Sequence, residues 1–329
     1  MLLAVLVLLA VTAWGAAALW IDGPASRPLA AALAVGFAVS MLALPLRVRS
    51  FWRGLLAAAL IFAGVLVWWN SIEPRNDRAW LPDVAELPRA RIDGDRVTIS
   101  NVRNFHYRSE NDYDAHWEER SYDLSQLRGV DIFLSYWGSP WIAHTIASWE
   151  FADGRHLAIS IETRKEHGEA YSAVLGFFRQ FELYYVIADE RDVIGVRANH
   201  RGEDVYLYRM RTPVPTARAV LLDYLEEVNR LVEHPRWYNA FSHNCTTTIR
   251  HHAQHVAAGN PFDWRILVNG KIDELGYERH QVDTSLPLEE LRRRSNITEK
   301  ARAAAGAADF SARIREGLPG SHPQLEDRR

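Results

Sequence analysis

The chain has 329 residues, with 38 basic and 41 acidic side chains and a formal net charge of −3 at pH 7. This balance, without a basic stripe that carries interleaved aromatic residues, gives no indication of a nucleic-acid partner. Cys245 is the only cysteine, which excludes an intrachain disulfide and a metal site built from several cysteines. No cofactor is expected.

Three apolar runs occupy the start of the chain. Residues 1–20 and 28–46 carry no charged side chain, and a third run covers residues 51–69 with only Arg53. Each is close to the roughly 20 residues that a helix needs to cross a bilayer. Buried core helices are the less favoured alternative, because uncharged runs of this length are uncommon in soluble cores. A cleaved signal peptide fits poorly, because no Lys or Arg precedes the first run.

The charges beside these runs predict an orientation. The connection between the second and third runs holds Arg47 and Arg49, Arg53 follows at the start of the third run, and residues 47–53 include no acidic side chain. Loops rich in Lys and Arg stay in the cytoplasm. We therefore expect a multi-pass protein of the bacterial inner (cytoplasmic) membrane. Its amino terminus is expected in the cytoplasm, its large domain in the periplasm, and the lipid bilayer as its first partner.

The rest of the chain alternates between strand-like and helix-like patterns. Residues 71–95 are polar and rich in proline, and are expected to form a linker. Strands are expected within residues 95–109, 129–151, 155–164, 181–199 and 203–211, and helices over residues 216–234, 245–258, 286–294 and 298–308. This order predicts an α+β class, a meander of antiparallel strands followed by helices. The main domain is expected over residues 96–270, and residues 271–329 form a helical extension with a mobile tail.

Cys245 occupies a position that suits a reactive thiol. Asn244 is a strong N-cap residue, so Cys245 is predicted at the first position of a helix. The amino end of a helix lowers the pKa of a thiol, and its free N–H groups can help to stabilise an oxyanion. A lone cysteine can instead be a small buried hydrophobic residue. For catalysis the cysteine also needs a base that accepts the proton of its thiol.

Several histidines near Cys245 are candidates for that base or for a metal site. His243 is close, but its short tether makes the required geometry uncertain. His251 and His255 stand four residues apart, a spacing typical of metal ligands, yet no carboxylate lies near them in sequence. An exposed helix face is the better interpretation. The acidic residues within 189–192 are expected in a solvated turn. No metal site is therefore predicted.

His144 is the stronger candidate because it lies within a strand-like run. If a turn at residues 152–154 joins this run to the next strand, His144 stands directly opposite Glu162. Ser148 and Ser160 then share the same polar face. A carboxylate that orients an imidazole is a common way to support a base. A two-residue turn shifts the register by one and weakens this argument. The alternative for Glu162 is an exposed charge at a strand end that pairs with Arg164 or Lys165.

The motifs also resemble a known family. The segments "FLSYWGSPWIAHTIASWEF", "LAISIETRKE", "YVIADERDVIGVR", "VYLYRM" and "WYNAFSHNCTTTI" resemble, in this order, the Lnb N-terminal periplasmic domain. The resemblance covers roughly residues 96–270. The order of histidine, polar partner and cysteine is similar to that of circularly permuted papain-like folds related to NlpC-type hydrolases. The resemblance implies a periplasmic thiol enzyme, with Cys245 as the nucleophile and His144 as the base. Glu162 matches the pattern, and its orienting role follows from the predicted register.

The named member of that family is a bacterial lipoprotein N-acyltransferase, in which the domain precedes the membrane helices. Here three apolar runs come first. The favoured hypothesis is a membrane-anchored cysteine acyltransferase or hydrolase that forms a thioester on Cys245, with a lipoprotein or phospholipid substrate. One alternative is a peptidase or amidase that acts on cell-wall peptide. Another is a membrane-tethered binding module without activity, in which Cys245 is buried and far from His144.

Overall fold

The computed structural model describes residues 1–242, 244–256 and 261–320. These residues form two compact units. The first, which we call the membrane unit, contains residues 1–77, 169–182 and 236–240. The second, which we call the sheet unit, contains the rest of the described chain. The tail expected to be mobile follows residue 308. Residues 309–320 of it are described and contribute Phe310 and Ile314 to the core, and residues 321–329 lie outside the described residues.

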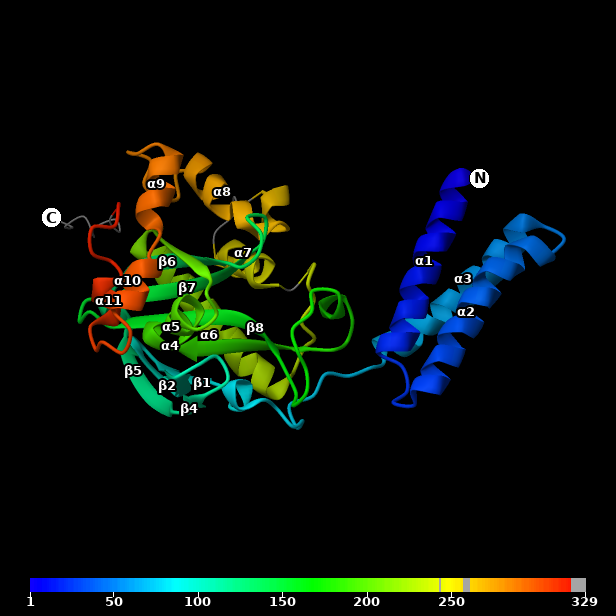
Figure 1. The fold of residues 1–329 in the computed structure, drawn as a ribbon, viewed down its shortest axis with the longest axis horizontal. Helices are drawn as coiled ribbons and strands as arrows, with labels where there is room; N and C mark the ends of the chain where they lie inside the picture. The colour runs from blue at the N-terminus through cyan, green and yellow to red at the C-terminus, as the bar shows by residue number, and fades with distance from the viewer. Residues whose placement is uncertain (243, 257–260, 321–329) are drawn as a thin grey trace. The chain divides into compact units, whose positions relative to one another are not determined.

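The membrane unit contains three long helices: α1 (Leu2–Ile21), α2 (Arg27–Arg47) and α3 (Phe51–Asn70). All three are long and apolar enough to cross a membrane, so the predicted spans are confirmed as helices. They lie side by side (Figure 1), and a small cluster packs where they meet: Leu8, Phe37, Met41 and Ala58. Many of their large apolar side chains remain exposed, as expected of helices that face lipid.

The sheet unit is built on an eight-stranded sheet of order β1-β2-β9-β8-β7-β6-β10, with β5 paired to β2. The strands are β1 (Arg89–Asp93), β2 (Arg96–Arg103), β5 (Trp117–Asp123), β6 (Leu127–Tyr136), β7 (Ala143–Phe151), β8 (His156–Arg164), β9 (Glu182–Ala188) and β10 (Asp204–Arg209). Two short strands, β3 (His106–Tyr107) and β4 (Tyr113–Asp114), pair separately. The α+β class is as predicted, but a simple antiparallel meander is wrong. β2 runs parallel to β9, and β10 pairs with β6.

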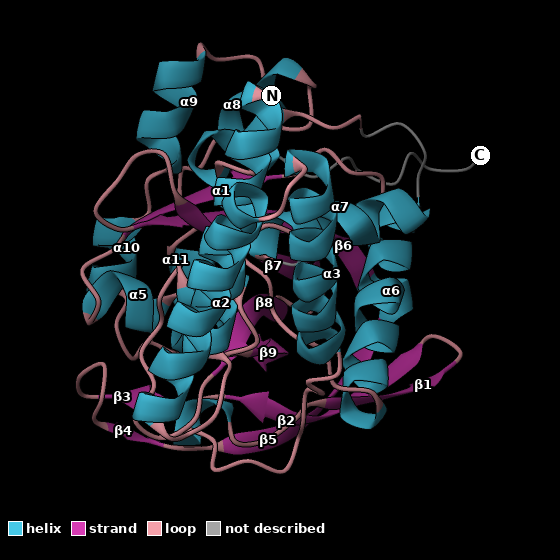
Figure 2. Cartoon of the chain, turned by 90° about the vertical axis from the view of Figure 1, so that its right-hand side faces the viewer, coloured by secondary structure: helices cyan, strands magenta, loops and turns pink. Residues whose placement is uncertain are grey.

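Helices follow and interrupt these strands: α4 (Glu190–Val193), α5 (Gly195–Asn199), α6 (Val214–Glu233), α7 (Cys245–Val256), α8 (Ile272–Glu278), α9 (Leu288–Ser295), α10 (Thr298–Ala303) and α11 (Phe310–Arg313). Figure 2 shows them in cyan against the magenta strands. The predicted start of α6 at Thr216 is wrong, because the helix begins at Val214 with Pro215 in its first turn. Proline suits that position because the first N–H groups of a helix have no acceptor within it.

Single turns of 3-10 helix complete the fold: η1 (Pro82–Val84), η2 (Leu124–Gln126), η3 (Leu175–Phe177), η4 (Trp264–Ile266) and η5 (Asn269–Lys271). The polar segment expected as a linker therefore contains both η1 and β1. The region after η5 contributes to the main core of the sheet unit through Ile297, Ala301, Phe310 and Ile314.

The register between β7 and β8 determines which side chains share the sheet face of His144. Ile146 pairs with Ser160 and Glu150 pairs with His156, which is the register predicted from the turn at residues 152–154. The opposite face of β7 is apolar, and Trp149 on that face donates its indole N–H to a carbonyl of α6. The face that carries His144 is mixed, because Ile146 on the same face belongs to the main core of the sheet unit.

Two predictions about residues 181–199 are wrong. The chain leaves β9 and forms α4 and α5 instead of a further strand, because Asp189 caps α4 by accepting a hydrogen bond from the Arg191 N–H. The acidic residues are not all solvated either. Glu190 is buried against Arg315 at 2.6 Å, and Asp192 is buried against Arg103 at 2.7 Å.

Candidate active site

Cys245 is the first residue of α7, as predicted. Asn244 caps the helix, since its Oδ1 accepts a hydrogen bond from the Thr247 N–H at 2.9 Å. Its carbonyl accepts a second one from the Thr248 N–H. The cysteine is 5% exposed, so its sulfur lies at a helix start and away from bulk water.

The sulfur of Cys245 is surrounded by hydrogen-bond donors. The Nδ2 atom of Asn269 lies 3.6 Å from it and the Thr246 hydroxyl lies 3.8 Å from it. Burial alone raises the pKa of the thiol. The charge of His144 and hydrogen bonds from His144, Thr145 and Thr246 outweigh burial and lower that pKa to about 7. A large share of the thiol is therefore ionised at neutral pH.

His144, on β7, is held from one side by polar groups of β8. Its Nε2 lies 2.7 Å from the Ser160 hydroxyl oxygen and 3.0 Å from Oε1 of Glu162. Ser160 in turn donates its hydroxyl proton to Glu162 at 2.7 Å. Because these groups accept from Nε2, the other ring nitrogen, Nδ1, is the one available to Cys245.

The charge of Glu162 also sets the protonation of His144. Burial lowers the pKa of His144, but the carboxylate of Glu162 outweighs burial, and the pKa rises to about 9. The two shifts together favour a thiolate on Cys245 and an imidazolium on His144 between the two pKa values.

Glu162 is fixed by a second layer of charge. Arg197, on α5, donates from Nη2 to Glu162 at 2.7 Å and from Nη1 to Glu203 at 3.1 Å. Burial raises the pKa of Glu162, but His144 and Arg197 together hold it well below the usual value. The alternative of an exposed charge at a strand end does not describe this residue. The neighbouring Arg164 donates to backbone carbonyls instead.

The other histidines near Cys245 have different surroundings. His243 lies outside the described residues. His251 and His255 are exposed on α7, as expected, but Nδ1 of His255 lies 3.2 Å from Asp223, a carboxylate that sequence reasoning did not find. His252, between them, is buried, with Nδ1 2.6 Å from Asp223 and Nε2 2.7 Å from the hydroxyl of Tyr185. These contacts tie α7 to α6 and β9. The carboxylate was missed in sequence because it is 29 residues away.

Sequence reasoning also missed Asn269, in η5. Its Oδ1 accepts a hydrogen bond from the Ala143 N–H at 2.9 Å. Because a backbone N–H can only donate, this bond fixes the side-chain amide with its Nδ2 toward the sulfur of Cys245. Gly270 allows the approach, since a Cβ there would lie 2.4 Å from the carbonyl carbon of Trp141. The Asn-Gly pair was a signal for a turn, and not for a site.

A cavity of about 450 Å³ lies on the apolar face of β7. Neither Cys245 nor His144 is among its lining residues. Thr145 and Thr246, which hydrogen-bond to each other at 3.0 Å, are among its lining residues and adjoin His144 and Cys245 in sequence. Most of its lining is apolar and includes Val130, Ile132, Leu134, Ala147, Val220 and Ile249. Arg211, Arg250 and Arg279 also line it. An apolar cavity with a few charged groups is typical of a ligand pocket.

Comparison with known proteins identifies the domain. Residues 113–270 match the family model of the Lnb N-terminal periplasmic domain. The resemblance seen in the sequence is therefore confirmed over these residues. Together with the three candidate spans, it describes a membrane-anchored periplasmic domain. The matched range includes Cys245, His144, Glu162 and Asn269. Searches of curated proteins and of solved structures gave no match.

Proposed function

We propose that this protein is a membrane-anchored thiol acyltransferase that carries an acyl group as a thioester on Cys245. The observation that carries the proposal is the buried contact of the Cys245 thiol with His144, whose imidazole is backed by Glu162. This is the arrangement of nucleophile, acid–base group and orienting group that acyl transfer requires. A binding module without activity requires no such contact.

The geometry supports a two-step reaction. The thiolate of Cys245 attacks the carbonyl carbon of an acyl ester, and the carbonyl oxygen becomes an oxyanion. Asn269 Nδ2 and the first N–H groups of α7 are the donors placed to stabilise this charge. The ester bond then breaks, and the imidazolium of His144 gives its proton to the departing alkoxide. The products are an alcohol and a thioester on Cys245.

The second step returns the enzyme to its starting state. An amine attacks the thioester carbonyl, and the now neutral His144 takes the proton that the amine loses. The carbon–sulfur bond breaks, Cys245 leaves as a thiolate and the acyl group remains on the new amide. Water in place of the amine gives a carboxylic acid, so exclusion of water decides between transfer and hydrolysis.

The cavity supports a lipid as the acyl donor. Its volume of about 450 Å³ falls in the range of ligand pockets, and its mostly apolar lining suits an acyl chain better than a cell-wall peptide. Arg211, Arg250 and Arg279 suit the phosphate of a phospholipid, because guanidinium groups bind phosphate in a bidentate manner. The three apolar helices keep the domain tethered to a bilayer, where such donors are abundant.

We further propose that the protein resides in the bacterial inner membrane with its amino terminus in the cytoplasm. The support is the connection between α2 and α3, where Arg47 ends α2 and Arg49 lies in the loop, with no acidic residue. Two single-cysteine variants test this orientation: Ser26→Cys and Arg49→Cys, each in a Cys245→Ser chain. Each is treated with a membrane-impermeant thiol reagent. Labelling in intact spheroplasts at residue 26 alone is expected, and labelling at residue 49 alone reverses the orientation.

One reconstitution tests the reaction class. The purified full chain is mixed with a phospholipid donor and a diacylated lipopeptide whose amino-terminal cysteine carries a free amine. Mass spectrometry is expected to find a third acyl chain on that amine, and none with the Cys245→Ala chain. A parallel sample contains a cell-wall peptide. If the wild-type chain cleaves this peptide and acylates nothing, the protein is a peptidase and not an acyltransferase.

A further inference from the structure

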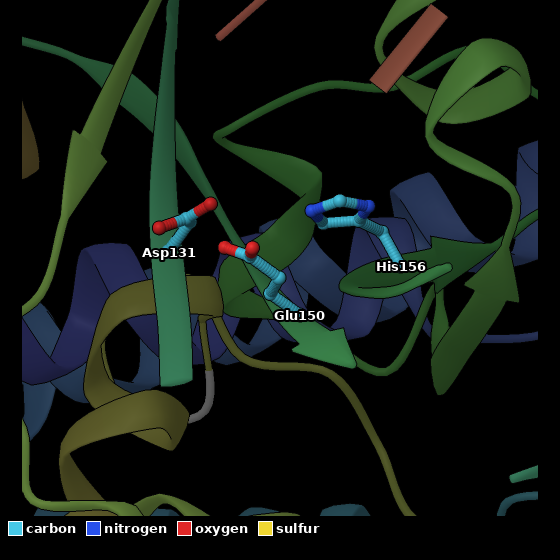
Figure 3. Close-up of side chains that lie close together, drawn as sticks. All are labelled: Asp131, Glu150 and His156. Carbon is cyan, nitrogen blue, oxygen red and sulfur yellow. The ribbon is translucent and has the colours of Figure 1, made fainter. Parts of the chain in front are cut away.

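A cluster of metal-ligating side chains lies on the same sheet face as His144. Asp131 on β6, Glu150 on β7 and His156 on β8 each offer one ligand atom, and these atoms lie within 4.8 Å of one another (Figure 3). Glu150 and His156 are direct partners in the register of β7 and β8. Along β7, Glu150 is roughly 20 Å from His144 at about 3.3 Å per residue. The cluster is therefore separate from the thiol.

The orientation of His156 points its lone pair into this cluster. Nδ1 lies 3.1 Å from the carbonyl oxygen of Gly154. A carbonyl only accepts, so Nδ1 carries the proton and Nε2 of the neutral ring carries the lone pair. Figure 3 shows the imidazole directed toward Glu150 and Asp131. His156 is 8% exposed, and among the described residues its Nε2 has no hydrogen-bond partner.

The spacing favours a shared cation over a direct ion pair. A protonated imidazole that pairs with a carboxylate places the two atoms about 2.7–3.2 Å apart. The described residues give Nε2 of His156 no such contact, although ligand oxygens of Asp131 and Glu150 lie within 4.8 Å of it. Two ligands that bind one ion at about 2.0–2.2 Å each are separated by roughly 3–4 Å. We propose that Asp131, Glu150 and His156 form a binding site for one divalent cation.

The chemistry of the ligands narrows the class of ion. Ca²⁺ takes oxygen ligands almost alone, whereas one imidazole with two carboxylates suits Zn²⁺ or Mn²⁺. Arg315 donates to Oδ2 of Asp131 at 2.8 Å, and Nη2 of Arg209 lies 3.7 Å from Oε2 of Glu150. A carboxylate has two oxygens and several lone pairs, so each can bind a guanidinium and a cation together. The Glu150 side chain is 24% exposed and gives the ion a path from solvent.

The position of the site indicates a structural role. The three ligands come from three adjacent strands, and the same strands carry His144 and Glu162 at their other end. One ion bound to all three strands would resist their separation, and this requires no substrate. The site therefore stands independently of the proposed acyl transfer.

Calorimetric titration tests the site. The full chain is purified in detergent with a tag free of histidine, treated with chelator and titrated with Zn²⁺ and, separately, Mn²⁺. One saturable site is expected, with affinity at least about tenfold lower in His156→Ala and in Glu150→Gln. The control, His255→Ala, removes half of the exposed histidine pair on α7 and is expected to keep the affinity. The melting temperature should rise with the ion only where the site is intact.

Two results of the titration overturn the proposal. One is the absence of saturable binding of either ion at millimolar concentration. The other is equal affinity in the wild-type chain and in Glu150→Gln, a substitution at a partly exposed position that leaves the fold testable even if His156→Ala does not fold. A crystal grown with Zn²⁺ adds a direct readout. An anomalous peak between the three residues supports the site, and a water there without such a peak overturns it.

Discussion

Nε2 of His144 lies 3.0 Å from Oε1 of Glu162, although both residues stand beyond the first paired residues of β7 and β8, Ile146 and Ser160. The β7–β8 ladder stops short of the two residues, while the β6–β7 ladder pairs His144 with Ser135. Ser160 and Arg197, which both hydrogen-bond to the same carboxylate oxygen, fix the side chain of Glu162. The protonation of His144 therefore depends on side-chain contacts that single substitutions can remove.

The pH dependence of acyl transfer should be bell-shaped. Below about pH 7 the thiol of Cys245 gains a proton and loses its nucleophilicity, because its pKa is about 7. Above about pH 9 the imidazolium of His144 loses the proton that the leaving group needs, because its pKa is about 9. Rates of thioester formation across this range measure both limbs. A rate that rises steadily through pH 9 contradicts the role of His144 as the acid.

Glu162→Gln should lower the pKa of His144 and raise that of the thiol, because the carboxylate supports the imidazolium. We expect the acyl-transfer rate to fall roughly 10²-fold with little change in KM. The chain has one cysteine, so the pH dependence of alkylation by iodoacetamide reports the thiol pKa directly. Asp153→Asn, in the turn of the same hairpin, is the control and should change neither value. An unchanged alkylation profile in Glu162→Gln removes Glu162 from the site.

Asn269 should act on the transition state. Asn269→Asp keeps an oxygen for the Ala143 N–H but loses the Nδ2 donor and places a negative charge near the sulfur. The rate should fall roughly 10²–10³-fold, as when an oxyanion donor is removed, and the thiol pKa should rise. Asn269→Ala loses the donor without the added charge. Its thiol pKa should therefore rise less than that of Asn269→Asp.

A purely structural role for Asn269 gives a different pattern. Loss of the Ala143 contact would then matter most, and Asn269→Ala would be the slower variant with the lower melting temperature. Equal thiol pKa values in both variants and in the wild-type chain would falsify contact with the thiolate.

The cavity should decide which acyl chains are used. Val220→Trp, on α6, places a large side chain in the lining and should raise KM for long-chain donors while short-chain donors still react. Glu226→Trp, exposed on the same helix, is the control. Competition between phospholipids of different chain length, read by mass spectrometry, measures the change. An unaltered preference in Val220→Trp indicates that the acyl chain binds elsewhere.

Local pattern was enough to predict the parts of the site that lie in adjacent segments. The turn at residues 152–154 fixed the register that brings His144 toward Glu162, and Asn244 marked the start of the helix that carries Cys245. Length and apolar composition predicted the three helices of the membrane unit. In each case the cause is local, either a turn, a cap or an uninterrupted apolar run.

Features set by distant partners could not be predicted. Glu190 looks solvated in sequence, but its partner Arg315 lies 125 residues away. The residues around His252 likewise showed no sign of its carboxylate partner, because Asp223 lies on a different helix, α6. Asn269 reaches the thiol only because Gly270 lets η5 pack against the loop before β7. The residue pattern within one segment does not indicate which distant side chains pack against it.

The most direct test of thioester chemistry is the mass of the intact protein after brief incubation with a phospholipid and no amine acceptor. The wild-type chain should gain the mass of one acyl group minus one proton, located on the peptide that contains Cys245 and released by neutral hydroxylamine. Cys245→Ser should gain no hydroxylamine-sensitive mass, because an ester resists that treatment. The thioester on Cys245 is contradicted if the wild-type chain stays unmodified without acceptor but still makes acylated product once the acceptor is added.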